Sequence, residues 1–294
     1  MVVTVDPEKF ALAAVIGWPI MHSRSPLMHN FWMKQLGISG RYLPIAIKPG
    51  KVVDALRALP GLGFSGCNVT IPHKMVAKDS VDDVDDAADK MGAISCVVVR
   101  EDSSLFGTNN DWIGFLRNLE YSLPKFVLKD RYVTVMGAGG AARAVCYGLI
   151  KSQVKKITVV NQTLNKSKLL QRLYGDIICV RSWENRNAAL EGSSLIVNAT
   201  SLGMVGMRDH DIPIEAIDQN AVVYDIVYTP SETNLIRRAS VNGNPTCTGL
   251  GMLLHQGPVA WKHWFGIEPL VTNELYDLVR RNLEAEYGPG KTIV

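Results

Sequence analysis

Small residues are spaced for nucleotide binding in the stretch VMGAGGAARA. Gly137, Gly139 and Ala142 fit the pattern G-x-G-x-x-A. The first glycine of this pattern permits a tight turn, the second lets backbone N–H groups approach a pyrophosphate, and the small third residue lets helix and strand pack closely. The free N–H groups and the dipole of the following helix also favour an anion. Because a strand precedes the turn and a second strand follows the helix, the sequence predicts a dinucleotide site.

The end of that second strand, KKITVVNQT, bears on the type of cofactor. A carboxylate about 20 residues after the glycines would bind the ribose diol of NAD. The corresponding position is near Asn161, followed by Gln162 and Thr163, so this carboxylate is missing. Lys166 and Lys168 come next and could attract a 2′-phosphate, although lysines at a helix start are also ordinary solvated residues. The sequence therefore favours NADP and leaves NAD possible.

A single lysine stands out in the stretch NVTIPHK. Lys74 comes two residues after Pro72, at the expected end of a strand. An ordinary turn from strand to helix needs no lysine there. Lys74 is therefore either a solvated surface charge or a functional residue, and this stretch alone favours the surface charge.

Composition narrows the class of protein. The chain has 294 residues, enough for one large domain or two ordinary ones, and its net charge of +3 gives no reason to expect nucleic acid or a membrane as partner. The five cysteines are odd in number and lack a C-x-x-C pair, which favours a reducing cytoplasm over a disulfide framework. The N-terminus reads as a first strand rather than a signal peptide. Neither His22 with His29 nor His255 with His263 has a third ligand nearby, so we expect no metal site.

The elements that position these residues change in pattern near residue 115. The first 110 residues alternate strand-like and helix-like pieces, including a strand at 93–100 that returns through LFGTNN. The strands after residue 130 are apolar and separated by helices, which indicates a parallel sheet. Residues 249–287 read as two helices. The sequence thus predicts a two-domain α/β protein: residues 1–114 plus 249–294 form the first domain, and residues 115–248 form a Rossmann-type domain.

Seven stretches in order along nearly the whole chain resemble the shikimate dehydrogenase family. They are GWPIMHSRSPLMHN (17–30), GCNVTIPHK (66–74), GTNNDWIGF (107–115), GAGGAARA (137–144), NATSLGM (198–204), YDIVYTP (224–230) and GLGMLLHQ (249–256). The resemblance implies an enzyme that reversibly reduces 3-dehydroshikimate to shikimate with a nicotinamide cofactor. It also implies that the first domain binds the small-molecule substrate, and it suggests a cytoplasmic monomer or homodimer that acts in aromatic amino acid biosynthesis.

The resemblance assigns roles residue by residue. The lysine of N-V-T-x-P-x-K and the aspartate of G-x-N-T-D match Lys74 and Asp111, which would form the catalytic pair. The serines of H-S-x-S-P match Ser23 and Ser25, which would hold the substrate carboxylate. The other implied substrate contacts are Thr70, Ser95, Tyr228 and Gln256. The implied cofactor contacts are Gly137, Ala138, Gly139, Gly140, Ala141, Asn161, Gln162, Thr163, Lys166, Ile226 and Gly249.

The chemistry of such a reaction agrees with a functional Lys74. Hydride transfer to a ketone leaves negative charge on its oxygen, and a neighbouring cation that is also a proton source stabilises that charge. A lysine paired with an aspartate is held in place for this task. Retention of both Lys74 and Asp111 also argues against a homologue that binds ligands without turnover.

Three positions depart from the family pattern. Ser95 replaces an asparagine that helps to bind substrate hydroxyls, Asn110 replaces the threonine of N-T-D, and Gln162 replaces the arginine of N-R-T. The first change leaves open a preference for quinate or another cyclic polyol acid. The third leaves open the choice between NADP and NAD.

Overall fold

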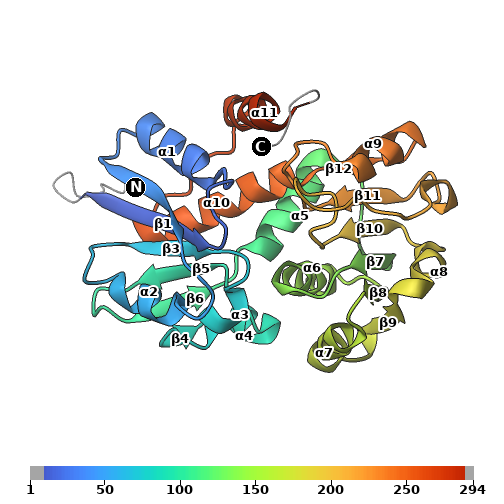
Figure 1. The fold of residues 1–294 in the computed structure, drawn as a ribbon, viewed down its shortest axis with the longest axis horizontal. Helices are drawn as coiled ribbons and strands as arrows, with labels where there is room; N and C mark the ends of the chain where they lie inside the picture. The colour runs from blue at the N-terminus through green and yellow to red at the C-terminus, as the bar shows by residue number, and fades with distance from the viewer. Residues whose placement is uncertain (1–9, 289–294) are drawn as a thin grey trace. The chain divides into compact units, whose positions relative to one another are not determined.

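The computed structural model describes residues 10–288 and forms two compact units (Figure 1). The first unit contains the described residues up to Asp111 together with Leu254–Val279, and the second contains Trp112–Leu253 and the described residues from Arg280 on. The contacts therefore divide the chain inside its last two helices, whereas we predicted that the whole segment 249–294 joins the first domain. The binding roles of the two predicted domains stay a prediction.

A mixed six-stranded sheet forms the centre of the first unit, in the order β2-β1-β3-β5-β6-β4. Strand β1 pairs in parallel with β2 and β3, whereas β5 is antiparallel to both β3 and β6. The predicted return of the chain through LFGTNN is thus confirmed as the β5–β6 pair. The strand expected to end at Pro72 ends earlier. The strands are β1 (Ala11–Gly17), β2 (Gly40–Ala46), β3 (Gly66–Val69), β4 (Asp83–Val84), β5 (Cys96–Val99) and β6 (Leu105–Thr108).

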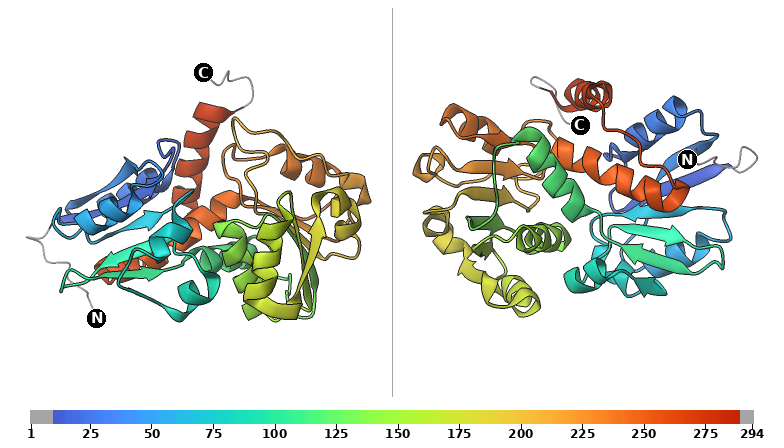
Figure 2. Two further views of the ribbon diagram at one scale, coloured as in Figure 1. Left: turned by 60° about the horizontal axis from the view of Figure 1, so that its bottom comes forward. Right: turned by 180° about the vertical axis from the view of Figure 1, so that it is seen from behind.

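Helices cover both faces of this sheet. The helices are α1 (Ser25–Gln35), α2 (Val52–Ala58), α3 (Lys74–Lys78), α4 (Asp86–Met91) and the parts of α10 (Gly249–Phe265) and α11 (Asn273–Tyr287) that belong to this unit. Side chains of α2, α3 and α4 share one apolar core with β1, β3 and β5. Helices α1 and α10 pack closely against each other, because a Cβ at Gly257 would lie 2.7 Å from the Trp32 ring. Only Leu254–Val279, most of α10 and the first part of α11, returns to the first unit as predicted, and the right-hand view of Figure 2 shows α10 from behind.

The second unit contains a fully parallel sheet in the order β12-β11-β10-β7-β8-β9. The parallel arrangement confirms the prediction from apolar strands that alternate with helices. The strands are β7 (Tyr132–Met136), β8 (Lys156–Asn161), β9 (Ile178–Ser182), β10 (Leu195–Asn198), β11 (Val222–Asp225) and β12 (Thr246–Cys247).

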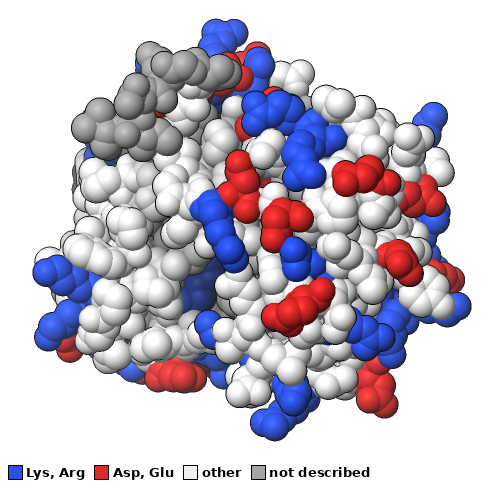
Figure 3. Space-filling model, turned by 45° about the vertical axis from the view of Figure 1, so that its right-hand side comes forward, with Lys and Arg blue, Asp and Glu red and all other residues white. Residues whose placement is uncertain are grey.

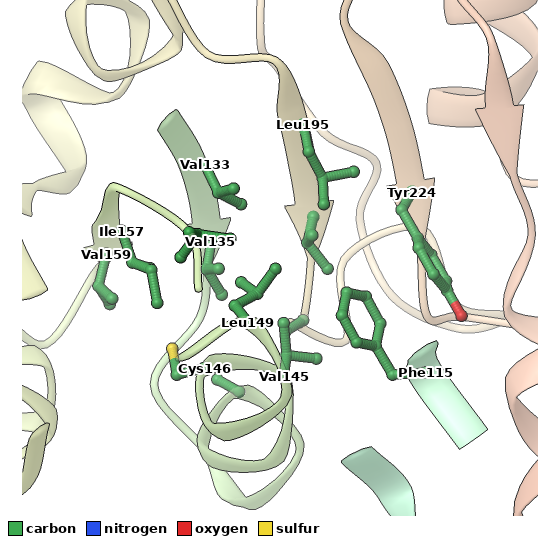
Figure 4. Close-up of a cluster of buried hydrophobic side chains, with 14 of the residues drawn as sticks. Phe115, Val133, Val135, Val145, Cys146, Leu149, Ile157, Val159, Leu195 and Tyr224 are labelled. Carbon is green, nitrogen blue, oxygen red and sulfur yellow. The ribbon is translucent and has the colours of Figure 1, made fainter. Parts of the chain in front are cut away.

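The core of the second unit lies between this sheet and three of its helices. Figure 4 shows Val145 and Leu149 pointing toward the valines of β7, with Phe115 stacked on Tyr224 at a centroid distance of 4.9 Å. A separate apolar cluster forms on the opposite face of the sheet. The helices on the first face are α5 (Asp111–Ser122), α6 (Gly140–Lys151) and α7 (Leu164–Tyr174), and those on the second are α8 (Arg186–Leu190) and α9 (Asn234–Val241).

The surface bears no large area of one charge on the face shown in Figure 3, where basic and acidic side chains are interspersed. Within residues 10–288, no helix is both long enough and apolar enough to cross a bilayer.

Candidate active site

Lys74 and Asp111 each stand at the first residue of a helix that follows a strand. Lys74 begins α3 rather than ending a strand, and its Nζ donates a hydrogen bond to Asp111 Oδ2. The side chains are only 13% and 4% exposed, so the two charges are largely withdrawn from solvent. Such a pair is held rigidly, because either charge alone would be costly to bury.

The turn before Lys74 is fixed by its neighbours. His73 N donates to Thr70 O over 2.9 Å, which closes the turn between β3 and α3. The buried His73 ring places Nε2 2.7 Å from Ile47 O, so this nitrogen carries the proton. The backbone position of Lys74 is therefore set by the sheet on one side and by the strand end at Ile47 on the other.

The turn before Asp111 is held by two polar side chains. Asn109 Oδ1 accepts from Asp111 N over 3.1 Å, and Asn109 Nδ2 donates to Ala93 O over 2.9 Å. Ser95 Oγ accepts from Asn110 N over 2.8 Å. Sequence reasoning missed the role of Asn109, although an asparagine two residues before a helix is a common way to bind the first free N–H groups.

The predicted carboxylate-binding serines lie in the loop and helix after β1. Ser23 Oγ accepts from Ser25 N over 3.3 Å, so the two serines lie next to each other at the start of α1. Thr70 lies against the end of β1, because Thr70 N donates to Ile16 O over 3.0 Å. A Cβ at Gly17 would lie 2.5 Å from Thr70 Cγ2, so the glycine makes room for this side chain.

A chain of buried aromatic contacts connects β2, β3, α1 and α10, and sequence reasoning missed it. Asn68 Oδ1 accepts from Tyr42 Oη over 2.6 Å, and the Tyr42 ring stacks on His29 at 4.0 Å. His29 Nδ1 accepts from Trp261 Nε1 over 2.7 Å. Burial lowers the pKa of His29 to about 3, so the ring is a neutral acceptor. Because Trp261 is on α10, these contacts position the helix that carries Gln256.

The glycine turn of the second unit has room for an anion. Gly137 has φ +113°, and a Cβ there would lie 2.5 Å from Ala199 O, so only glycine fits. A Cβ at Gly139, by contrast, would meet nothing within 4 Å. Gly139 is the N-cap of the 12-residue α6 and provides no side-chain cap, so the first helical N–H groups stay available. Ala138, Gly140 and Ala141 complete this turn, whose geometry fits a pyrophosphate.

The end of β8 has no carboxylate to repel a phosphate. Asn161 Nδ2 donates to Thr163 O over 2.9 Å, which shapes the turn into α7. The first turn of α7 contains no acidic residue, and both Gln162 and Lys166 are exposed. These residues fit the adenosine end of NADP better than that of NAD.

The segments that follow β11 and β12 bring together two predicted cofactor contacts, Ile226 and Gly249. A Cβ at Gly249 would lie 2.2 Å from Ile226 O, so the two segments touch through backbone. The neighbouring Asp225 accepts from Asn198 Nδ2 over 2.8 Å and from Thr233 Oγ1 over 2.6 Å, and burial raises its pKa to about 6. Sequence reasoning missed this network.

The predicted site residues fall into both units. Lys74 and Asp111 belong to the first unit, and so do the predicted substrate contacts Ser23, Ser25, Thr70, Ser95 and Gln256. Tyr228 belongs to the second unit, as do all the predicted cofactor contacts. Within the described residues, no group of three His, Cys, Asp or Glu side chains could hold a metal ion.

Comparison with known proteins covers both units. Residues 15–97 match the family model of the shikimate dehydrogenase substrate binding domain, and residues 121–230 match that of shikimate / quinate 5-dehydrogenase. The shikimate dehydrogenase (NADP(+)) of Paramagnetospirillum magneticum is 43% identical over 267 residues, which cover 91% of this chain and 97% of that protein. The chain belongs to the shikimate dehydrogenase family.

Solved structures of family members have the same architecture. A shikimate 5-dehydrogenase from Thermus thermophilus in complex with NADP(H) and shikimate is 31% identical, with a TM-score of 0.82 over 92% of this chain and 99% of that one. A quinate dehydrogenase from Corynebacterium glutamicum in complex with NAD is 27% identical, with a TM-score of 0.83 over 94% of this chain and 99% of that one. The predicted family and the two-domain fold with a Rossmann-type domain are thus confirmed.

Proposed function

We propose that this chain catalyses the reversible, NADP-dependent reduction of 3-dehydroshikimate to shikimate, a step in aromatic amino acid biosynthesis. Family membership makes the chain a nicotinamide-dependent oxidoreductase, and its similar curated relatives are named as NADP-dependent shikimate dehydrogenases. The single observation that carries the proposal is the ion pair of Lys74 and Asp111, which is largely buried from solvent, in a chain that belongs to this family.

The proposed mechanism gives each residue of the pair one task. Lys74 Nζ hydrogen-bonds the substrate oxygen at the reacting carbon, stabilises the charge that develops on it and supplies its proton during reduction. Asp111 orients the ammonium group and balances its charge, so that the cation can stay where water is largely excluded. When bound, the nicotinamide supplies the hydride. In the reverse direction Lys74 takes up the proton that the hydroxyl loses.

The proposed binding residues divide between carboxylate, hydroxyls and cofactor. Ser23 and Ser25 bind the substrate carboxylate, and the uncapped α6 N-terminus binds the pyrophosphate. We further propose that Lys166 contributes positive charge toward a 2′-phosphate. The remaining proposed substrate contacts are Thr70, Ser95, Tyr228 and Gln256, and the remaining cofactor contacts are Gly137, Ala138, Gly139, Gly140, Ala141, Asn161, Gln162, Thr163, Ile226 and Gly249.

The test is a steady-state assay of the purified protein with shikimate and quinate, each with NADP and with NAD. We expect the highest kcat/KM for shikimate with NADP, with some turnover of NAD. A preference for NAD of about tenfold or more, or an absence of shikimate oxidation, would refute the proposal.

The carboxylate assignment predicts a KM effect. Replacement of Ser25 by Ala should raise the KM for shikimate more than it lowers kcat. The reason is that the variant loses a hydrogen bond to a charged group, which contributes about 1 kcal/mol or more to binding. Ser122→Ala is a matched control that should leave KM unchanged, because Ser122 Oγ donates a hydrogen bond to Asn118 Oδ1 of the same helix, α5. Unchanged kinetics in both Ser23→Ala and Ser25→Ala would place the carboxylate elsewhere.

A second candidate function is a quinate/shikimate dehydrogenase with relaxed preference, which Ser95 favours. Its hydroxyl is shorter than a carboxamide and already accepts from Asn110 N, so it cannot bridge two substrate hydroxyls as asparagine would. We expect Ser95→Asn to raise the ratio of kcat/KM for shikimate to that for quinate. An unchanged ratio, in a variant whose unfolding midpoint matches the wild type, would show that Ser95 does not set specificity.

Three further features complete the proposal. We propose a cytoplasmic location, a monomer or homodimer, and no nucleic acid partner. Size-exclusion chromatography with light scattering would decide the oligomeric state.

A further inference from the structure

The 2′-phosphate of NADP lacks one expected partner in this chain. Gln162 occupies the position of the arginine in N-R-T, and a carboxamide supplies no positive charge. Lys166 is a point charge on a flexible stem, whereas a guanidinium binds a phosphate with two parallel hydrogen bonds. A guanidinium from another element would supply the missing two-bond partner of the phosphate, and this step rests on the proposed function.

The neighbouring strand places an arginine beside the end of β8. Strands β8 and β9 are parallel, and their register pairs Val160 with Arg181 and Asn161 with Ser182. Paired strands lie only about 4.8 Å apart, and parallel strands end at the same edge of a sheet. Arg181 is thus one strand spacing from Val160, which lies two residues before position 162.

Alternation along the strands gives Arg181 a definite face. Ile157 and Val159 of β8 pack into the α6-side core, as do Ile178 and Val180 of β9. Because successive side chains point to opposite faces, Arg181 lies on the other face, together with its partner Val160. Position 162 is the next after Val160 in this alternation. Arg181 therefore shares the face on which an arginine at 162 would stand.

The guanidinium of Arg181 is available for a ligand. The residue is exposed, and the one hydrogen bond of its side chain in the described part of the chain is a long contact of 3.4 Å from Nη1 to Val180 O. Arg186, five residues later, already pairs with Asp211 over 2.8 Å. An arginine without a carboxylate partner, beside a site that lacks its own arginine, can bind an anion without first breaking an ion pair.

We propose that Arg181 binds the 2′-phosphate of NADP and sets the cofactor preference in place of an arginine at position 162. The Arg181 guanidinium on β9 and the Lys166 ammonium at the start of α7 would then contact the phosphate from two different elements. Both residues act on the adenosine end and leave the hydride transfer itself untouched.

The experiment compares binding of 2′,5′-ADP and 5′-AMP by isothermal titration calorimetry, because the two ligands differ only in the 2′-phosphate. We expect the wild type to bind 2′,5′-ADP more tightly. Arg181→Gln should weaken binding of 2′,5′-ADP by about tenfold or more, as expected for a lost hydrogen bond to a charged group, and should leave 5′-AMP unchanged. Arg181→Lys should restore part of the loss.

Arg172→Gln is the matched control, because Arg172 is exposed on the last turn of α7 and away from its N-terminus. It should change neither affinity. An unchanged ratio of the two affinities in Arg181→Gln, or a wild type that does not distinguish the two ligands, would overturn the inference. A wild type that distinguishes them but does not oxidise shikimate would overturn the proposed function alone.

Discussion

Lys74→Ala is expected to lower kcat by about two orders of magnitude or more, since it removes both the proton donor and the charge that stabilises the developing oxyanion. The substrate carboxylate and the cofactor bind through other residues in the proposed site, so KM should change much less. Steady-state kinetics with shikimate and NADP would measure both constants, and circular dichroism would confirm that the fold is retained.

Lys78→Ala is a matched control on the same helix. Lys78 also pairs with an aspartate, Asp89, over 3.0 Å, but Asp89 is 68% exposed. This variant should keep near-normal kcat, because an exposed pair contributes little and touches no substrate in the proposed mechanism. A near-normal kcat in Lys74→Ala would exclude Lys74 as a catalytic residue.

A double-mutant cycle tests whether the pair acts as a unit. Asp111→Asn removes the charge that orients Lys74 and should behave much like Lys74→Ala. If the two residues share one task, the double variant should lose far less activity than the product of the two single losses. Fully multiplicative losses would show that the two side chains act independently.

Short stretches of sequence predicted the helices and strands well, because turn residues and apolar patterns act on neighbouring residues of the chain. The glycines of GAGGAARA fit a strand, turn and helix, and the structure has β7 and α6 there. The apolar runs of the second unit predicted buried parallel strands for the same reason. The error at Lys74 is also local: NVTIPHK continues an apolar strand pattern, but the turn from Thr70 to His73 ends β3 and starts α3.

Contacts between distant segments could not be predicted from such signals. Trp261 and His29 are 232 positions apart, and only the packing of α10 on α1 shows that the tryptophan donates to the histidine. The pairing of Arg181 with Val160 likewise depends on the register of two strands, which no single stretch encodes. The resemblance supplied the pair of Lys74 and Asp111, whereas the supports around Asp111 emerged only from the structure.

Buried titratable groups give the second large expected effect, a dependence of stability on pH. Burial lowers the pKa of His210 to about 4 and that of His29 to about 3, from an ordinary value near 6.5. Below about pH 6.5 these two histidines are therefore protonated in the unfolded chain but neutral in the folded chain. As pH falls from about 6.5 toward the folded pKa, each histidine lowers the free energy of unfolding by about 1.4 kcal/mol per pH unit.

Asp225 acts in the opposite direction. Burial raises its pKa to about 6 from an ordinary value of 3.8. The folded chain keeps this proton where the unfolded chain loses it, so the contribution of Asp225 is fully present below about pH 3.8 and is lost as pH rises through 6. Between pH 5 and 6, the two histidines and Asp225 therefore partly cancel.

Variants at these positions should change the pH slope with opposite signs. His210 is the better histidine to replace, because neither ring nitrogen has a hydrogen-bond partner within the described residues. His210→Met should flatten the loss of unfolding free energy between pH 6 and 5 by about 1.4 kcal/mol per pH unit, and Asp225→Asn should steepen it by a similar amount. Urea unfolding at about pH 5.0, 5.5 and 6.0 would give both slopes relative to the wild type. Equal slopes in all three proteins would mean that these groups titrate alike in the folded and unfolded chain, and that their burial does not shift their pKa values.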